Sequence, residues 1–106
     1  MKSPKTSGAE MSREKVYAFL KQVPKDRVTT YKELAGAAGT HPRAVAVYMK
    51  TNEDPVNIPC FRVISSDGSL GGYSGKDGIK GKLRLLERHG IEVVKGRVPE
   101  KYVHRF

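Results

Sequence analysis

The segment from Thr30 to Lys50 constrains the fold of this chain more than any other. Thr30 and Glu33 have the T-x-x-E spacing of a capping box, which predicts that a helix begins here. Gly39 can adopt the left-handed conformation that ends a helix, and Pro42 is preorganised for the first turn of the next one. Two short helices joined by a tight turn are typical of a helix-turn-helix. An ordinary corner between two bundle helices has the same pattern and remains an alternative.

Around this pair of helices, the sequence predicts further short elements. Apolar residues at helical spacing predict a helix between Ser12, the expected N-cap, and Pro24. A short strand with a turn at Asp67-Gly68, a further helix and a small hairpin around Lys95-Gly96 are expected after residue 60. In that further helix the apolar stripe is expected to consist of Ile79, Leu83 and Leu86, flanked by Lys80, Lys82, Arg84 and Arg88.

These elements predict a fold that is mainly α with small β elements. We expect one compact helical domain over residues 12–106, which contains the helix-turn-helix, is similar to a winged helix and carries a short hairpin or wing. Residues 1–11 contain charge but no apolar stretch and are expected to form a flexible tail. No apolar run approaches the roughly 20 residues that a membrane span needs.

Charge narrows the class of partner. The chain has 20 Lys and Arg residues against 11 Asp and Glu residues, so its formal net charge is +9 and its pI is about 9.9. Such an excess favours a polyanion such as nucleic acid, because each neutralised phosphate releases condensed counterions. The alternative is that the charge serves the solubility of a small domain.

Cys60 is the only cysteine, which excludes an internal disulfide and a metal site built from several cysteines and fits a reducing compartment. A lone cysteine among apolar neighbours often serves as packing. A reactive thiolate needs a helix N-terminus, a cation or a base nearby. Arg62 is two residues away, and the chain has three histidines as candidate bases, His41, His89 and His104. These residues by themselves leave both alternatives open.

Several spaced motifs resemble one protein family. The stretch IPCFRVISSDGSLGGYSG, residues 58–75, is similar to the active-site segment of the O6-alkylguanine-DNA alkyltransferases, whose usual motif reads Pro-Cys-His-Arg-Val. Residues 28–49, VTTYKELAGAAGTHPRAVAVYM, are similar to that family's helix-turn-helix, and residues 80–90, KGKLRLLERHG, to its final helix. The resemblance covers residues 12–104 and lacks the family's N-terminal domain, as in the short alkyltransferase-like proteins.

The resemblance implies single-turnover DNA repair by base flipping. An O6-alkylguanine would be swung out of the duplex through the minor groove, and Cys60 would take its alkyl group irreversibly. The candidate catalytic residues are Cys60, the hinge residue Asn52, His89 and Arg62; lesion contacts are expected from Tyr31, Val63, Tyr73 and Ser74, and DNA contacts from Arg43, Ala44, Tyr31 and Ser66. Double-stranded DNA is the expected partner of a monomer without cofactor or metal, in a cytoplasmic or nucleoid-associated location.

Two departures from the family's pattern affect the activation of the thiol. Phe61 stands where the family has the histidine that activates the cysteine through a water, and His89 stands where it has a supporting glutamate. Without that relay, three sources of activation remain. They are a helical turn that begins at Cys60, the charge of Arg62, and His89 acting as a base.

Three functions remain open at this point: an alkyltransferase, an alkyltransferase-like protein that binds O6-alkylguanine without repairing it and signals to another pathway, and a helix-turn-helix regulator. Cys60 favours the first, because the non-repairing relatives typically carry tryptophan or alanine at this position. Phe61 favours the second. A regulator would explain the charge but would leave IPCFRV and the glycine-rich segment without a role.

Overall fold

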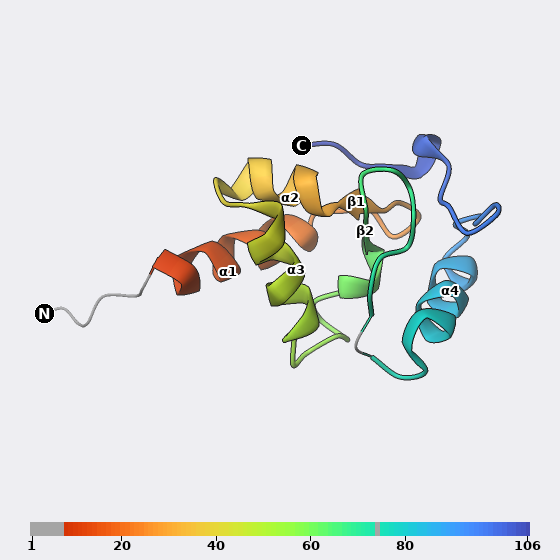
Figure 1. Ribbon diagram of the computed structural model, residues 1–106, viewed down its shortest axis with the longest axis horizontal. Coiled ribbons are helices and arrows are strands. Elements are labelled where there is room, and N and C mark those ends of the chain that lie inside the picture. The colour runs from red at the N-terminus through yellow and green to blue at the C-terminus, as the bar shows by residue number, and fades with distance from the viewer. Residues whose placement is uncertain (1–7, 74) are drawn as a thin grey trace, which may run out of the picture.

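The computed structural model describes residues 8–73 and 75–106, with side chains from residue 12 onward. Helices dominate, and one two-stranded sheet lies among them (Figure 1). In chain order the elements are α1 (Gly8–Leu20), β1 (Thr29–Thr30), α2 (Tyr31–Ala38), α3 (Pro42–Lys50), the 3₁₀ turn η1 (Cys60–Arg62), β2 (Val63–Ile64), α4 (Gly78–Arg88) and the 3₁₀ turn η2 (Glu100–Tyr102). The predicted fold class is confirmed. Within the described ranges, none of the helices has the length and apolar character that crossing a membrane requires.

Helices α2 and α3 form the predicted helix-turn-helix, and local signals set its boundaries. Thr30 Oγ1 accepts a hydrogen bond from the backbone N–H of Glu33 at 3.0 Å, and Gly39 ends α2 with a φ of 70°. Pro42 occupies the first turn of α3, as predicted. The Glu33 carboxylate, which a complete capping box would turn back onto Thr30, binds the Arg105 guanidinium at 3.0 Å.

Helix α1 begins earlier than the sequence predicts. Its first residue is Gly8, so Ser12 lies inside the helix and the prediction of Ser12 as N-cap is wrong. The three residues between them, Ala-Glu-Met, are strong helix formers, which explains the extension. Residues 1–7 of the expected tail lie outside the described residues.

The two strands connect the start of the helix-turn-helix to the segment that follows Cys60. They pair in parallel, with Thr29 opposite Val63 and Thr30 opposite Ile64, and all four residues are buried. Parallel strands need a long crossover connection, and here α2 and α3 provide it. The sheet therefore holds the helix-turn-helix and the cysteine segment in one rigid arrangement.

The predicted turn and hairpin are both confirmed. Gly68 has a φ of 91°, and its N–H donates to the carbonyl three residues earlier at 2.9 Å. Val94 and Arg97 exchange backbone hydrogen bonds of 2.8 and 3.0 Å around Lys95-Gly96. These two turn residues have φ values of 53° and 78°, as the tightest hairpin turns require.

Two adjoining hydrophobic cores lie on either side of the sheet residues. The first joins α1, α2 and α3 to Cys60, and the second gathers Leu86 of α4 with Phe61 and apolar residues of the C-terminal segment. The predicted stripe of α4 is partly wrong, because Ile79 is 46% exposed whereas Lys82 is 0% exposed. Lys82 takes the buried position because its ammonium group finds carbonyl acceptors there.

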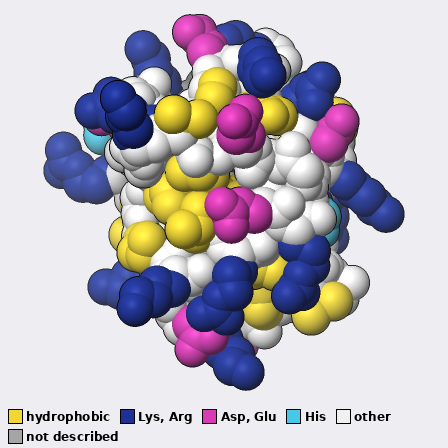
Figure 2. Space-filling model, turned by 90° about the vertical axis from the view of Figure 1, so that its right-hand side faces the viewer, with side chains coloured by type: hydrophobic (Ala, Val, Ile, Leu, Met, Phe, Trp, Pro, Cys, Tyr) yellow, Lys and Arg dark blue, Asp and Glu magenta, His cyan; other side chains and the backbone are white. Residues whose placement is uncertain are grey.

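The positive charge lies at the two flanks of the chain. Residues 28–75, which include α2, α3 and η1, contain four basic and four acidic residues. Residues 76–106 contain nine basic and four acidic residues, and residues 1–27 contain seven and three. Figure 2 looks onto the α4 side of the molecule, where Lys and Arg side chains surround the face. The net charge of +9 therefore comes from the residues before 28 and after 75.

Candidate active site

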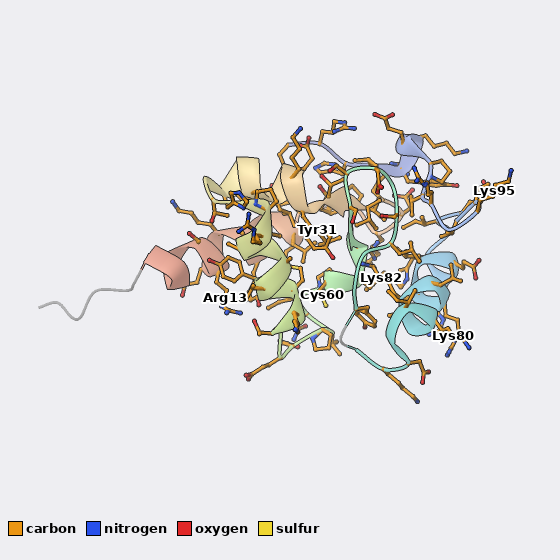
Figure 3. The ribbon with its side chains drawn as sticks, viewed as in Figure 1. Arg13, Tyr31, Cys60, Lys80, Lys82 and Lys95 are labelled. Carbon is orange, nitrogen blue, oxygen red and sulfur yellow. The ribbon has the colours of Figure 1, made fainter. Side chains whose placement is uncertain are left out.

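A cavity of about 500 Å³ lies between α3 and the segment that contains Cys60. Its lining consists of Tyr31, Ala46, Met49, Lys50, Cys60, Gly72 and Tyr73. Figure 3 shows Tyr31, Cys60 and Lys82 in the middle of the molecule, whereas Lys80 and Lys95 lie toward its α4 end. Three of the predicted site residues, from α2, η1 and the loop before α4, therefore meet at one cavity.

Cys60 is held in place by its own backbone and by Asn52. The Cys60 side chain is buried, and its N–H donates to the Ile58 carbonyl at 2.8 Å. The Asn52 Nδ2 donates to the same carbonyl at 2.8 Å, while its Oδ1 accepts from the Asp54 N–H at 2.9 Å. Asn52 thus links the segment just after α3 to the turn that carries the thiol, which is a suitable position for a hinge residue.

The helical turn at Cys60 is too short to supply much of a dipole. Turn η1 comprises three residues. The N–H groups of Cys60, Arg62 and Val63 all donate to backbone carbonyls. The macrodipole arises from aligned peptide units over a longer helix. Of the three sources of activation predicted from the sequence, this one is weak.

The two tyrosines of the cavity, Tyr31 and Tyr73, keep their hydroxyl protons at neutral pH. Burial, and secondarily the negative charge of Cys60, raises the pKa of Tyr31 and that of Tyr73 above the ordinary value. Gly71 allows the loop to approach Tyr31 closely, since its φ is 71° and an added Cβ would lie 2.9 Å from the Tyr31 hydroxyl oxygen. Each hydroxyl can therefore donate a hydrogen bond near the thiol at neutral pH. Ser74, the other predicted pocket residue, lies outside the described residues.

Lys82 is the part of this site that the sequence did not predict. Its ammonium group donates to the carbonyls of Val63 at 2.6 Å, of Gly72 at 3.2 Å and, at shorter range, of Leu70. Burial lowers its pKa to about 8, while attraction to the charge of Cys60 acts in the opposite direction. The available signal was its spacing, because Lys82 precedes the buried Leu86 by four residues on the same face of α4.

Val63 is fully buried, and its carbonyl oxygen is already engaged by Lys82. The lesion contact expected from Val63, if made by this oxygen, would use its second lone pair. Lys82 also binds carbonyls of the loop that brings Gly72 to the cavity. It therefore fixes the backbone on which the Val63 prediction depends.

Arg62 is placed differently from the sequence prediction. Its guanidinium donates to the backbone carbonyls of Arg27 at 3.2 Å and Pro24 at 3.5 Å, and to that of Lys25. It also lies over the Phe61 ring, with 4.8 Å from Cζ to the ring centroid. Burial lowers the pKa of Arg62. The guanidinium is therefore committed to the loop after α1, and its expected fold toward the thiol is corrected to this structural role.

Phe61 and His89, the two departures from the family's pattern, contact each other. Their ring centroids are 5.1 Å apart with an interplanar angle of 39°. The His89 Nδ1 lies 2.8 Å from the Leu85 carbonyl oxygen, so in a neutral ring Nδ1 carries the proton and Nε2 is the acceptor. The positions that the family uses for its relay are adjacent here, but an aromatic contact replaces the hydrogen bond.

Helix α3 presents a narrow exposed face. Arg43, Ala46, Val47 and Lys50 are exposed at helical spacing, whereas Ala44 is half-buried against the first core. Ala46 is thus the small residue that is exposed on the outer face, and the expected DNA contact of Ala44 stays a prediction. His41 caps the helix, because its Nδ1 accepts from the N–H of Arg43 at 3.1 Å. This cap fixes the backbone at Arg43, one of the expected DNA contacts.

Ser66 lies apart from the cavity that contains Cys60. It is exposed and lines a separate hollow of about 330 Å³ with residues such as Thr30 and Lys32. This position leaves it free to contact DNA beside the lesion, and its role stays a prediction. Among the described residues, no three His, Cys, Asp or Glu side chains gather as a metal site would need.

Comparison with known proteins points to one family. The profile described as "6-O-methylguanine DNA methyltransferase, DNA binding domain" matches residues 11–91. A "Bifunctional methyltransferase/endonuclease" from Picrophilus torridus is 48% identical over 88 residues, which cover 81% of this chain and 29% of that protein. A "Methylated-DNA--protein-cysteine methyltransferase" from Methanothermobacter thermautotrophicus is 41% identical over 86 residues, covering 81% and 48%. The chain thus spans less than half the length of either relative.

Two solved structures have a similar fold. Atl1 of S. pombe, in complex with damaged DNA containing O6-carboxymethylguanine, matches with a TM-score of 0.75 at 26% identity, covering 90% of this chain and 95% of that one. The O6-methylguanine-DNA methyltransferase of Pyrococcus kodakaraensis matches with a TM-score of 0.67 at 46% identity, covering 74% and 46%.

Proposed function

Because the chain belongs to the O6-methylguanine DNA methyltransferase family, we propose that it binds duplex DNA containing O6-alkylguanine and transfers the alkyl group to Cys60. One observation carries this proposal: the only thiol of the chain lies in the wall of a cavity of about 500 Å³ beside α3. A flipped nucleotide would enter this cavity, with Arg43 of α3 filling the gap in the base stack.

The transfer needs a thiolate, an open path to the alkyl carbon and a proton for the released base. The sulfur of Cys60 forms a bond to the alkyl carbon, the bond from that carbon to O6 breaks, and its electron pair stays on the guanine. The guanine then takes up a proton and becomes the ordinary base. The Tyr31 and Tyr73 hydroxyls support this step, because their raised pKa values keep them as donors.

Activation of the thiol is assigned to a different set of residues from the family's relay. Phe61 cannot accept or relay a proton, and the Arg62 guanidinium is bound elsewhere. Lys82 is a buried cation whose charge attracts that of Cys60. Lys82 therefore stabilises negative charge in the site, while His89 Nε2 is the one remaining base candidate from the sequence.

The test is the mass of the protein after incubation with a duplex that contains O6-methylguanine. We expect a gain of one methyl group, located on the peptide that contains Cys60 and missing in Cys60→Ala. The same Cys60→Ala variant should still bind the lesion duplex, which shows that the variant is folded. An unchanged mass at excess lesion DNA under reducing conditions contradicts the transfer.

Lesion binding without transfer is the second candidate function. The contact between Phe61 and His89 favours it, because that contact replaces the expected proton relay. The similarity to Atl1 in complex with damaged DNA also favours it. Preference for the lesion duplex over an undamaged duplex, together with an unchanged mass, would establish this function.

A further inference from the structure

We propose that Arg13 of α1 is a positioning residue for alkyl transfer, because it caps the C-terminal end of α3 and so fixes this helix against the turn that carries Cys60. The inference rests on the proposed function and concerns a residue that the sequence motifs did not single out. Arg13 is not among the described residues that line the cavity, so it acts on the reaction through other groups.

The Arg13 guanidinium binds two hydroxyl groups at the end of α3. Its Nη1 donates to the Thr51 Oγ1 at 2.9 Å and to the Tyr17 hydroxyl at 3.0 Å. The Thr51 hydroxyl in turn donates to the Val47 carbonyl at 2.8 Å. The Tyr17 hydroxyl donates to the Tyr48 carbonyl at 2.7 Å. Two chains of hydrogen bonds therefore start at one guanidinium and end on two helix carbonyls, and the bonds within such a chain strengthen each other.

This arrangement meets a need of the helix terminus. The last four carbonyls of a helix have no partner within it, and α3 ends at Lys50 with Thr51 as its C-cap. A cation is also favourable here, at the negative end of the helix dipole. Arg13 supplies that cation from α1, and its Cζ lies 4.8 Å from the centroid of the Tyr48 ring. Arg13 therefore holds α1 and α3 together at the point where α3 ends.

The end of α3 leads directly to the thiol. Asn52 follows Thr51 in the chain, and its Nδ2 donates to the Ile58 carbonyl at 2.8 Å. The same carbonyl accepts the N–H of Cys60 at 2.8 Å. In the view of Figure 3, α3 runs between Arg13 and Cys60. A continuous path of hydrogen bonds and two peptide units thus connects the Arg13 cap to the turn that carries the nucleophile.

Transfer requires the flipped nucleotide and the thiol to be held in one geometry. Arg43, near the first residue of α3, is expected to fill the gap in the base stack, whereas Cys60 follows the last residue of the same helix. A misplacement of about 1 Å between reacting groups can cost about a hundredfold in rate. Arg13 therefore controls the rate of transfer more than the affinity for undamaged DNA.

The experiment compares the single-turnover transfer rate from a saturating O6-methylguanine duplex with the affinity for an undamaged duplex. We expect Arg13→Met to slow transfer about tenfold, a part of the cost of such a misplacement, and to change the undamaged affinity little. Arg13→Lys keeps a cation at the end of α3 and should retain part of the rate. Lys15→Met is the matched control, because it removes the same charge from an exposed position of α1.

Thr51→Val tests the path itself, because it removes the hydroxyl group and retains a side chain of similar shape. Since Arg13→Met already breaks this chain of hydrogen bonds, the double variant should be no slower than Arg13→Met alone. Additive losses would overturn the proposal, as would an unchanged transfer rate in Arg13→Met. Equal losses of transfer and of undamaged affinity would also overturn it.

Iodoacetamide labelling of the free protein separates positioning from loss of structure, because Cys60 is buried and is the only thiol. Arg13→Met and the unmodified protein should be labelled at similar rates, and faster labelling of the variant would overturn the positioning role. If the unmodified protein gains no methyl group, the proposed function itself fails, which is a distinct result. The preference for lesion over undamaged duplex in a Cys60→Ala background then becomes the readout, and an unchanged preference in Arg13→Met overturns the proposal.

Discussion

Lys82 ties the stability of this protein to pH. In the folded protein, burial lowers the pKa of its side chain from 10.5 to about 8, whereas the unfolded chain keeps the ordinary value. Between these values the unfolded chain binds more protons, so the free energy of unfolding rises with pH. We expect a rise of up to about 1.4 kcal/mol per pH unit above about pH 8. Urea unfolding at a series of pH values measures it.

Lys82→Met is the comparison that isolates this contribution, because it removes the titrating group and retains most of the apolar side chain. The rise above about pH 8 should then be missing. The measurement should stop below pH 10, the ordinary pKa of tyrosine. The raised pKa values of Tyr31 and Tyr73 reduce stability as the pH rises further. Parallel pH profiles for the two proteins would show that Lys82 is not the cause.

At the scale of residues, motifs identified the nucleophile and its neighbours but not the buried Lys82. Cys60, Asn52 and Tyr31 were expected from the resemblance, and the structure places them around the cavity or its supporting turn. Lysine is usually a surface residue, so the sequence predicts solvent exposure for Lys82. Its burial depends on the carbonyl oxygens of Val63, Leu70 and Gly72 in the segment before α4, an arrangement that the pattern of the helix itself does not reveal.

At the scale of elements, α3 carries Arg43, the residue expected to fill the gap that a flipped nucleotide leaves in the base stack. Arg43→Ala should weaken binding of a lesion duplex roughly tenfold and of an undamaged duplex much less. The reason is that filling the emptied stack offsets the few kcal/mol of unstacking that only the flipped complex requires. Titration of labelled duplexes in a Cys60→Ala background measures both affinities. Lys32→Ala controls for the loss of charge, and equal losses on the two duplexes would reduce Arg43 to a phosphate contact.

The elements also show why some boundaries were predictable. Helix α2 begins and ends at local signals, the Thr30 cap and the left-handed Gly39, and these need no tertiary contact. The start of α1 was harder to predict. Residues 9–11 have a high helix propensity, so the helix continues past Ser12 instead of beginning there. The orientation of α4 about its axis depended on Lys82, whose ammonium group finds carbonyl acceptors in the interior. Those acceptors are present only once the rest of the chain has folded.

At the scale of the whole molecule, the neutral balance of residues 28–75 changes how DNA binding should respond to salt. Residues 28–75 as a whole carry as many acidic as basic residues, whereas the α4 side in Figure 2 is rimmed by Lys and Arg. The phosphate contacts that cause salt dependence should therefore include the flanks. A duplex long enough to extend past α3 should bind with a steeper salt slope than a short one, because it offers phosphates to these flanks.

Replacing Lys80, Arg84 and Arg88 of α4 by glutamine tests this assignment. Each lost phosphate contact lowers the slope of log K against log salt by about 0.9, so three contacts correspond to about 2.7 on a long duplex. A duplex of about one helical turn, covered by α3 alone, should keep its slope in the variant. Lys15, Lys21 and Lys25 replaced together remove the same charge from the other flank and measure its share of the phosphate contacts in the same way. An equal decrease in both triple variants on the short duplex would indicate long-range attraction rather than contact. An unchanged slope of the α4 variant on the long duplex would exclude this face from the DNA interface, leaving its charge to the solubility of the domain.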